Sequence, residues 1–116
     1  MTKVKIITFG FKFGHPNCNF WFDVSFLKNP VRQPGRSLND KLDDAMIDFI
    51  KEQPESYQLI DIIVNLVLFV SHLDDDIRIG IGCNGGRHRS RAIAHLVKQK
   101  INNEELLQIL HREDCF

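Results

Sequence analysis

The chain has 116 residues, of which 43% are hydrophobic, and its fifteen basic and fifteen acidic side chains give a formal net charge of zero. This length is enough for one hydrophobic core, and no Gly/Ser-rich or Pro-rich stretch separates two units, so we predict one domain over residues 1–116. The charge balance excludes a protein held on nucleic acid by a global positive field, so any anion site must be local.

The apolar runs and the cysteines predict the cellular compartment of the protein. The first residues form no apolar signal segment, and the longest apolar run, Ile60 to Val70, is too short to cross a bilayer. The cysteine spacing matches neither a disulfide framework nor a metal knuckle; the three residues are Cys18, Cys83 and Cys115. We therefore predict a cytoplasmic protein with reduced thiols, no membrane partner, no metal and no cofactor.

The N-terminal third predicts two strands and a loop. Val4 to Phe9 is rich in β-branched and aromatic side chains and stops at a glycine, which is typical of a strand. Phe20 to Val24 is a second extended segment that precedes turn signals containing proline. Residues 29–39 show no apolar periodicity and form a predicted surface loop, in which Arg32 or Arg36 can close over a ligand.

Two helices are predicted next. Ser37 or Asn39 is the expected N-cap of the first helix, which ends near Gln53-Pro54. Its apolar positions approximate helical spacing and are Leu42, Met46, Ile47, Phe49 and Ile50. The second helix is predicted from about Glu55 to His72, and its apolar residues on most faces indicate that it packs between other layers.

The C-terminal third predicts a strand, a helix and a last strand. Ile77 to Cys83 alternates apolar with small residues and is the predicted central strand. A helix follows from Arg89 to Ile101, and a strand from Leu106 to His111. Strands and helices in this alternation predict an α/β fold, a single-domain three-layer sandwich with a largely parallel or mixed sheet.

The loop between the central strand and the helix after it carries the main motif. In an α/β sheet, ligands collect beyond the carboxyl ends of strands, where helix N-termini present free N–H groups. Gly85 and Gly86 let a ligand approach the backbone, and Arg87, His88 and Arg89 add side-chain donors beside the positive end of the helix dipole. The loop therefore predicts a phosphate site at Cys83, Asn84, Gly85, Gly86, Arg87, His88, Arg89 and Ser90.

Other interpretations of the loop stay open. It can be a plain glycine-rich turn with solvated basic residues. Cys83 and Arg89 also fit the C-x5-R-S spacing of cysteine-dependent phosphatases, in which a thiolate attacks phosphorus and Asp23 would be the acid. Those enzymes usually carry His where this chain has Gly82, and a buried Asp23 can instead orient an arginine of the loop. A third alternative is a protein-protein adapter that forms a homo-oligomer through its apolar helix.

Three separated motifs resemble the C-terminal domain of the RNase adapter protein RapZ and its relatives. They lie at residues 8–14, 22–30 and 79–90, and His111-Arg112-Glu113 resembles a fourth, so the resemblance covers nearly the whole chain. It implies a fold similar to a phosphofructokinase subdomain and a noncatalytic regulatory adapter. It also implies self-association, binding of RNA, and sensing of glucosamine-6-phosphate through the Cys-x-Gly-Gly loop.

The resemblance adds Lys12 to the predicted ligand site. The sequence contains no Gly-x4-Gly-Lys-Ser/Thr, so the resemblance implies a free-standing C-terminal half without the nucleotide-binding domain of the family. Asn84 stands where the family usually has Thr, Phe13 where it often has His or Tyr, and Ser25 where it has Arg.

Overall fold

The computed structural model describes residues 4–73 and 75–114. Within them, the strands form one sheet in the order β2-β3-β1-β4, and every pairing is parallel. The strands are β1 (Val4–Gly10), β2 (Phe20–Asp23), β3 (Arg78–Cys83) and β4 (Leu107–His111). The α-helices are α1 (Asp44–Lys51), α2 (Pro54–Val70) and α3 (Arg89–Ile101), and the 3-10 helices are η1 (Phe11–Phe13), η2 (Pro30–Arg32) and η3 (Arg112–Asp114). The predicted single-domain α/β sandwich with a parallel sheet is confirmed.

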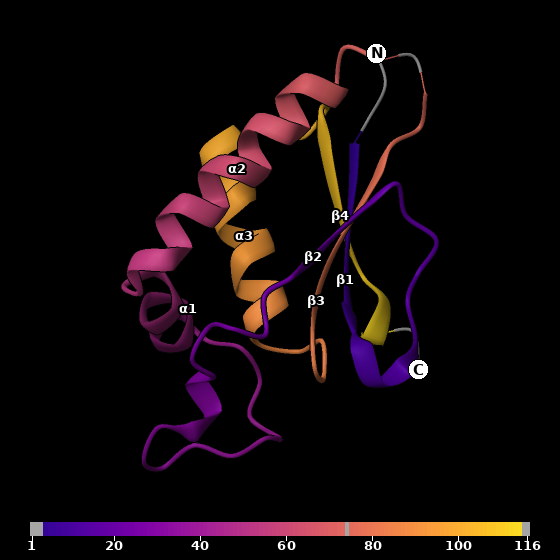
Figure 1. Cartoon of the computed structure of the whole chain (residues 1–116). Coiled ribbons are helices and arrows are strands. Elements are labelled where there is room, and N and C mark those ends of the chain that lie inside the picture. Colours follow the sequence, from indigo (N-terminus) through magenta and orange to yellow (C-terminus); the bar gives the residue numbers. More distant parts are fainter. Residues whose placement is uncertain (1–3, 74, 115–116) are drawn as a thin grey trace.

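The helices lie together on one side of the sheet (Figure 1). Helix α3 contacts β1, β3 and β4, and α1 and α2 contact α3 in turn. Alternate residues of β3 point into the core beneath the helices, where Ile79 and Ile81 are fully buried. The core continues through Ile63 and Val67 of α2, which are also fully buried.

The opposite side of the sheet is covered by the segment between β1 and β2. The ring of Phe9 packs edge-on against Phe11, with the ring centroids 4.8 Å apart. A Cβ atom at Gly80 would lie 2.9 Å from the ring of Trp21, and one at Gly82 would lie 2.5 Å from the ring of Phe9. The glycines of β3 are therefore needed because aromatic rings occupy the space above them.

The start of α1 differs from the prediction. Its N-cap is Asp43, and not Ser37 or Asn39, because the Asp43 side chain accepts a hydrogen bond from the Met46 N–H at 2.9 Å. That bond, followed by the Arg36 side chain at 2.6 Å, lowers the pKa of Asp43. The bounds of the other predicted elements lie within two residues of the observed ones. No helix in the described part of the chain is long and apolar enough to span a membrane.

Candidate functional site

The loop from residue 83 to residue 89 lies at the carboxyl end of the sheet, against the end of β1. Gly86 has a φ of +73°, and a Cβ atom there would lie 2.5 Å from the carbonyl carbon of Phe9. A Cβ atom on Gly10 would lie 2.6 Å from the carbonyl carbon of Gly85. The backbone N–H of Lys12 donates to the Asn84 carbonyl at 3.3 Å. Gly10 and Gly86 are thus required because two backbone segments touch here.

Side chains from the first turn of α3 contact the loop. The Nε atom of Arg91 donates to the Gly86 carbonyl at 3.1 Å, and its Nη2 atom pairs with Asp114 at 2.8 Å. The hydrogen bond from Arg91 lowers the pKa of Asp114. The Cys83 Sγ atom lies 3.4 Å from the Ser90 hydroxyl, and both side chains are buried. These contacts connect the loop to α3 and to Asp114, which follows β4.

The cationic side chains of the motif point in different directions. His88 is buried, and its Nε2 atom lies 2.6 Å from the Asp40 carbonyl; since a carbonyl only accepts, this nitrogen carries the proton. Arg89 points toward the segment after β2. Arg87 and Lys12 are exposed, and the Lys12 ammonium lies 5.2 Å from the ring centroid of Phe13. Arg87 and Lys12 therefore face outward, whereas His88 and Arg89 face inward.

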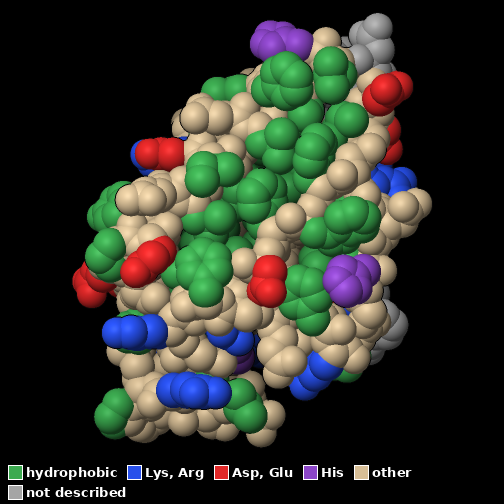
Figure 2. Space-filling view, viewed as in Figure 1, with side chains coloured by type: hydrophobic (Ala, Val, Ile, Leu, Met, Phe, Trp, Pro, Cys, Tyr) green, Lys and Arg blue, Asp and Glu red, His purple; other side chains and the backbone are tan. Residues whose placement is uncertain are grey.

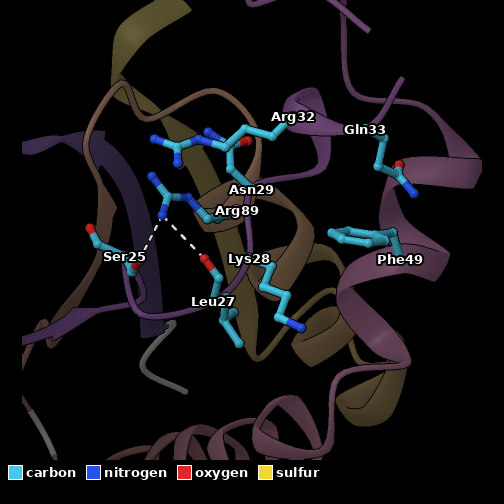
Figure 3. Close-up of a pocket in the computed structure, with 8 residues that line it drawn as sticks. All are labelled: Ser25, Leu27, Lys28, Asn29, Arg32, Gln33, Phe49 and Arg89. Atoms are coloured by element: carbon cyan, nitrogen blue, oxygen red, sulfur yellow. Dashed lines mark hydrogen bonds between the residues drawn. The ribbon is translucent and has the colours of Figure 1, made fainter. Parts of the chain in front are cut away.

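Arg89 connects the loop to a neighbouring pocket. Its Nη1 atom donates to the carbonyls of Ser25 at 2.6 Å and Leu27 at 3.2 Å (Figure 3). Its Nε atom is buried and has no partner among the described residues. A buried donor without a partner costs free energy, so the two hydrogen bonds of the Nη1 atom must offset this cost to hold Arg89 in place.

The pocket has a volume of about 420 Å³. It is lined by Ser25, Leu27, Lys28, Asn29, Arg32, Gln33, Phe49 and Arg89. In Figure 3 the guanidinium groups of Arg32 and Arg89 lie near one another on the same side of the pocket. The lining therefore contains three cations and no carboxylate. We call this set of residues the cationic pocket.

The structure separates the two arginines that were predicted to close over a ligand. Arg32 lines the cationic pocket, whereas Arg36 is bound to the N-cap carboxylate of α1. The prediction that Asp23 is buried and orients a loop arginine is wrong, because Asp23 is exposed and accepts a hydrogen bond from the Ser25 N–H at 2.9 Å. The carbonyl groups that hold Arg89 follow Asp23 closely in the chain.

A charged segment after β4 supports the end of β1. Glu113 is buried, pairs with Arg112 at 2.9 Å, and accepts a hydrogen bond from the Gly10 N–H. Arg112 also donates to the Gly10 carbonyl at 3.3 Å, so it does not extend a free basic patch. His111 lies nearby, with its Nδ1 atom 2.7 Å from the Thr8 hydroxyl. The sequence pattern did not indicate this role for Glu113, which sits in a short polar segment.

Comparison with known proteins agrees with this architecture. The family profile described as RapZ C-terminal domain matches residues 2–114. The chain belongs to this family. A relative from Clostridium beijerinckii, described as a nucleotide-binding protein, is 32% identical over 118 residues, which cover 96% of this chain and 40% of the relative. Membership supports a regulatory adapter domain, and the chain spans about two fifths of that relative's length.

The thiol of this RapZ C-terminal domain is poorly placed for phosphatase chemistry. Cys83 is 3% exposed, and the Arg89 fork is directed at the Ser25 and Leu27 carbonyls. Cys18 and Cys83 are free thiols, and the predicted reduced state of Cys115 lies outside the described residues. Among the described residues, no cluster of His, Cys, Asp and Glu is arranged to hold a metal ion.

We expect no hydrolysis of p-nitrophenyl phosphate by the wild-type chain, since an attacking thiolate must reach phosphorus. Phosphate binding should be equal in wild type and Cys83→Ser, which changes only one buried atom. Absorbance of released nitrophenol and titration calorimetry measure the two quantities. Turnover that disappears in Cys83→Ser while phosphate still binds would show that the domain is an enzyme.

The free energy of unfolding is expected to fall as the pH is lowered from 7 to 5. Burial, followed by the charge of Arg91, lowers the pKa of His111, so the unfolded state binds a proton more readily than the folded state. The free energy of unfolding begins to fall near pH 6.5, because an unfolded histidine has a pKa of about 6.5. Asp43 and Asp114, whose pKa values are lowered, reduce it only at more acidic pH. Urea unfolding of His111→Asn should show a weaker pH dependence, with exposed His72→Asn as the control. Equal pH dependence in wild type and His111→Asn would contradict this assignment.

Proposed function

We propose that this domain is a noncatalytic regulatory adapter that senses a phosphate-bearing small molecule. The observation that carries the proposal is the cationic pocket, in which Lys28, Arg32 and Arg89 surround one cavity without a carboxylate. Like charges gathered in this way repel one another, and an anion relieves the repulsion. A cavity of about 420 Å³ also lies within the size range of small-molecule sites.

Arg89 makes the loop and the cationic pocket parts of one site. It is the first residue of α3, so it stands at the positive end of a helix dipole beside the loop glycines. We assign the phosphate group to Arg89 and the loop 83–90, with Lys12 at the rim, and the rest of the ligand to the cationic pocket.

A sugar phosphate fits this division because it joins one dianion to several hydroxyl groups. Asn29 and Gln33 offer polar side chains to the hydroxyls, and Phe49 offers an apolar face to the ring. Glucosamine-6-phosphate is the first compound to test, since the family resemblance implies it. Its ammonium group must then lie away from Lys28, Arg32 and Arg89.

The test is a thermal-shift titration with glucosamine-6-phosphate, glucose-6-phosphate, glucosamine and inorganic phosphate. A ligand that binds only the folded state raises the melting temperature. We expect both sugar phosphates to raise it, free glucosamine to leave it unchanged, and inorganic phosphate to act weakly. No shift with any phosphate compound would contradict the proposed function.

RNA is a second candidate ligand. Arg87 and Lys12 are exposed beside the loop, and Phe13, which follows Lys12, is 52% exposed. Exposed cations next to an aromatic ring suit a backbone phosphate and a stacked base. A gel shift should weaken steeply with added salt, and Arg87→Ala should reduce the salt dependence by about one phosphate contact. RNA binding that does not weaken with added salt, or the absence of binding, would argue against RNA as a ligand.

We also propose that the domain acts in the cytoplasm as a homo-oligomer. The free thiols of Cys18 and Cys83 suit a reducing compartment. Helix α2 leaves Ile62 and Phe69 exposed, at 57% and 65%, as expected for a helix with a further contact to make.

A further inference from the structure

A second cavity lies where α1, α2 and α3 meet, and its volume is about 290 Å³. It is lined by Lys51, Tyr57, Ile60, Leu96, Gln99 and Lys100, and we call it the three-helix cavity. It is distinct from the area over α2 and β2 in Figure 2, where apolar side chains gather. A helix turns by about 100° per residue, so Tyr57 and Ile60 lie on the side of α2 opposite the exposed Ile62 and Phe69.

The floor of the three-helix cavity is apolar and preformed. Ile60 and Leu96 are only 5% and 4% exposed, and both belong to the hydrophobic core. The junction of α1 and α2 is held by Ser56, which is fully buried and whose hydroxyl donates to the Ile50 carbonyl at 2.6 Å. Because the walls are already joined in this way, a ligand can enter with little reorganisation of the protein.

The rim of the three-helix cavity is cationic. Lys51 and Lys100 are exposed, and the lining contains no carboxylate. Lys51 forms no ion pair with the residues that the structure describes. Lys100 pairs with Asp61 at 3.6 Å, and these two side chains are 58% and 65% exposed. An ion pair so open to water contributes little stability, so the anionic group of a ligand can replace Asp61.

We propose that the three-helix cavity binds a small carboxylic acid with an apolar body, of the aryl or short acyl class. The apolar body lies on Ile60 and Leu96, where its removal from water stabilises the complex. The carboxylate lies at the rim, where two ammonium groups attract it. Tyr57, which is 55% exposed, adds an aromatic ring to the lining.

Size and charge favour a small molecule over a protein segment. The volume lies at the lower end of the range for small-molecule sites, about 300–1,000 Å³, and suits one ring or a short chain. A stable protein partner needs a far wider interface, of about 1,000 Å² or more. The exposed Glu52 and Glu55 follow Lys51 closely in the chain, so the positive charge is confined to the rim and forms no broad basic surface.

The test is a titration of the isotope-labelled full chain with 3-phenylpropanoate, 3-phenylpropanol and acetate, followed by amide chemical shifts. The acid carries both the ring and the charge, the alcohol only the ring, and acetate only the charge. We expect the acid to saturate a site centred on Lys51, Tyr57 and Lys100. The alcohol should bind at least about threefold more weakly and acetate at least about tenfold more weakly. No binding of the acid, equal binding of the alcohol, or shifts centred on the cationic pocket would overturn the proposal.

Charge variants test the rim. Replacing both lysines, Lys51→Glu with Lys100→Glu, should weaken the binding of 3-phenylpropanoate by about tenfold or more. Asp61→Asn removes the competing carboxylate and should strengthen binding by about two- to threefold. The matched control is Lys98→Glu, because Lys98 is exposed on α3 outside the lining and should leave the affinity unchanged.

This inference does not depend on the proposed function, because the three-helix cavity and the cationic pocket have no lining residue in common. Arg89→Ala should therefore leave the binding of 3-phenylpropanoate unchanged. Circular dichroism confirms that each variant is folded. Full affinity in a folded Lys51→Glu and Lys100→Glu variant, or an equal loss in Lys98→Glu or Arg89→Ala, would show that the acid binds elsewhere.

Discussion

Gly86→Ala is expected to lower the free energy of unfolding by about 2–4 kcal/mol. The new Cβ atom would overlap the backbone of Phe9 and Gly10, which cannot move away without breaking the end of β1. The φ of +73° adds strain of its own, since side chains disfavour this conformation. Urea unfolding followed by circular dichroism measures the change.

Gly85→Ala is the matched control for this substitution. A Cβ atom at Gly85 would meet nothing within 4 Å, and the φ of this residue is not positive. Its free energy of unfolding should therefore change by less than about 1 kcal/mol. Equal losses of unfolding free energy in the two variants would show that contact with β1 is not what destabilises Gly86→Ala.

Arg89→Ala is expected to weaken the binding of a sugar phosphate by roughly 10- to 100-fold, because a hydrogen bond to a charged group is worth about 1.5–3 kcal/mol. Arg89 is the residue that the loop and the cationic pocket share. Arg89→Lys keeps the charge but loses the planar fork, and it should recover only part of the affinity. Titration calorimetry with glucose-6-phosphate measures both variants.

Two controls separate binding from folding in this experiment. Lys98→Ala removes an exposed cation from the last turn of the same helix, far from its N-terminus, and should leave the affinity unchanged. The melting temperature of each variant shows whether the segment after β2, whose carbonyls Arg89 holds, stays in place. A folded Arg89→Ala variant with full affinity would remove the cationic pocket from the site.

Local patterns in the sequence were sufficient to predict the fold class and most element bounds. The branched residues of β1 and β3 and the apolar periodicity of α2 and α3 are properties of neighbouring residues. The motif at residues 83–90 belongs to the same category, since Gly85 and Gly86 stand between a strand and a helix. For these features, sequence neighbours are also the structural neighbours that matter.

Contacts that residue types and periodicity do not reveal decided the rest. The N-cap of α1 went to Asp43 because Arg36 and Met46 both bind its carboxylate, which no count of capping residues reveals. Glycines 80 and 82 are explained only by aromatic rings from β1, from the first loop and from β2. The predicted burial of Asp23 failed because β2 is an edge strand, and edge position is a property of the whole sheet.

The sequence by itself determined that a cationic glycine loop follows the central strand of an α/β domain. The tertiary structure decided where its side chains point: it turned His88 toward Asp40 and brought Arg89 into the same pocket as Arg32, 57 positions earlier in the chain. The physical reason is that backbone carbonyls of other segments are the hydrogen-bond partners of these side chains. Those of Ser25 and Leu27 reach Arg89 only after the sheet has assembled.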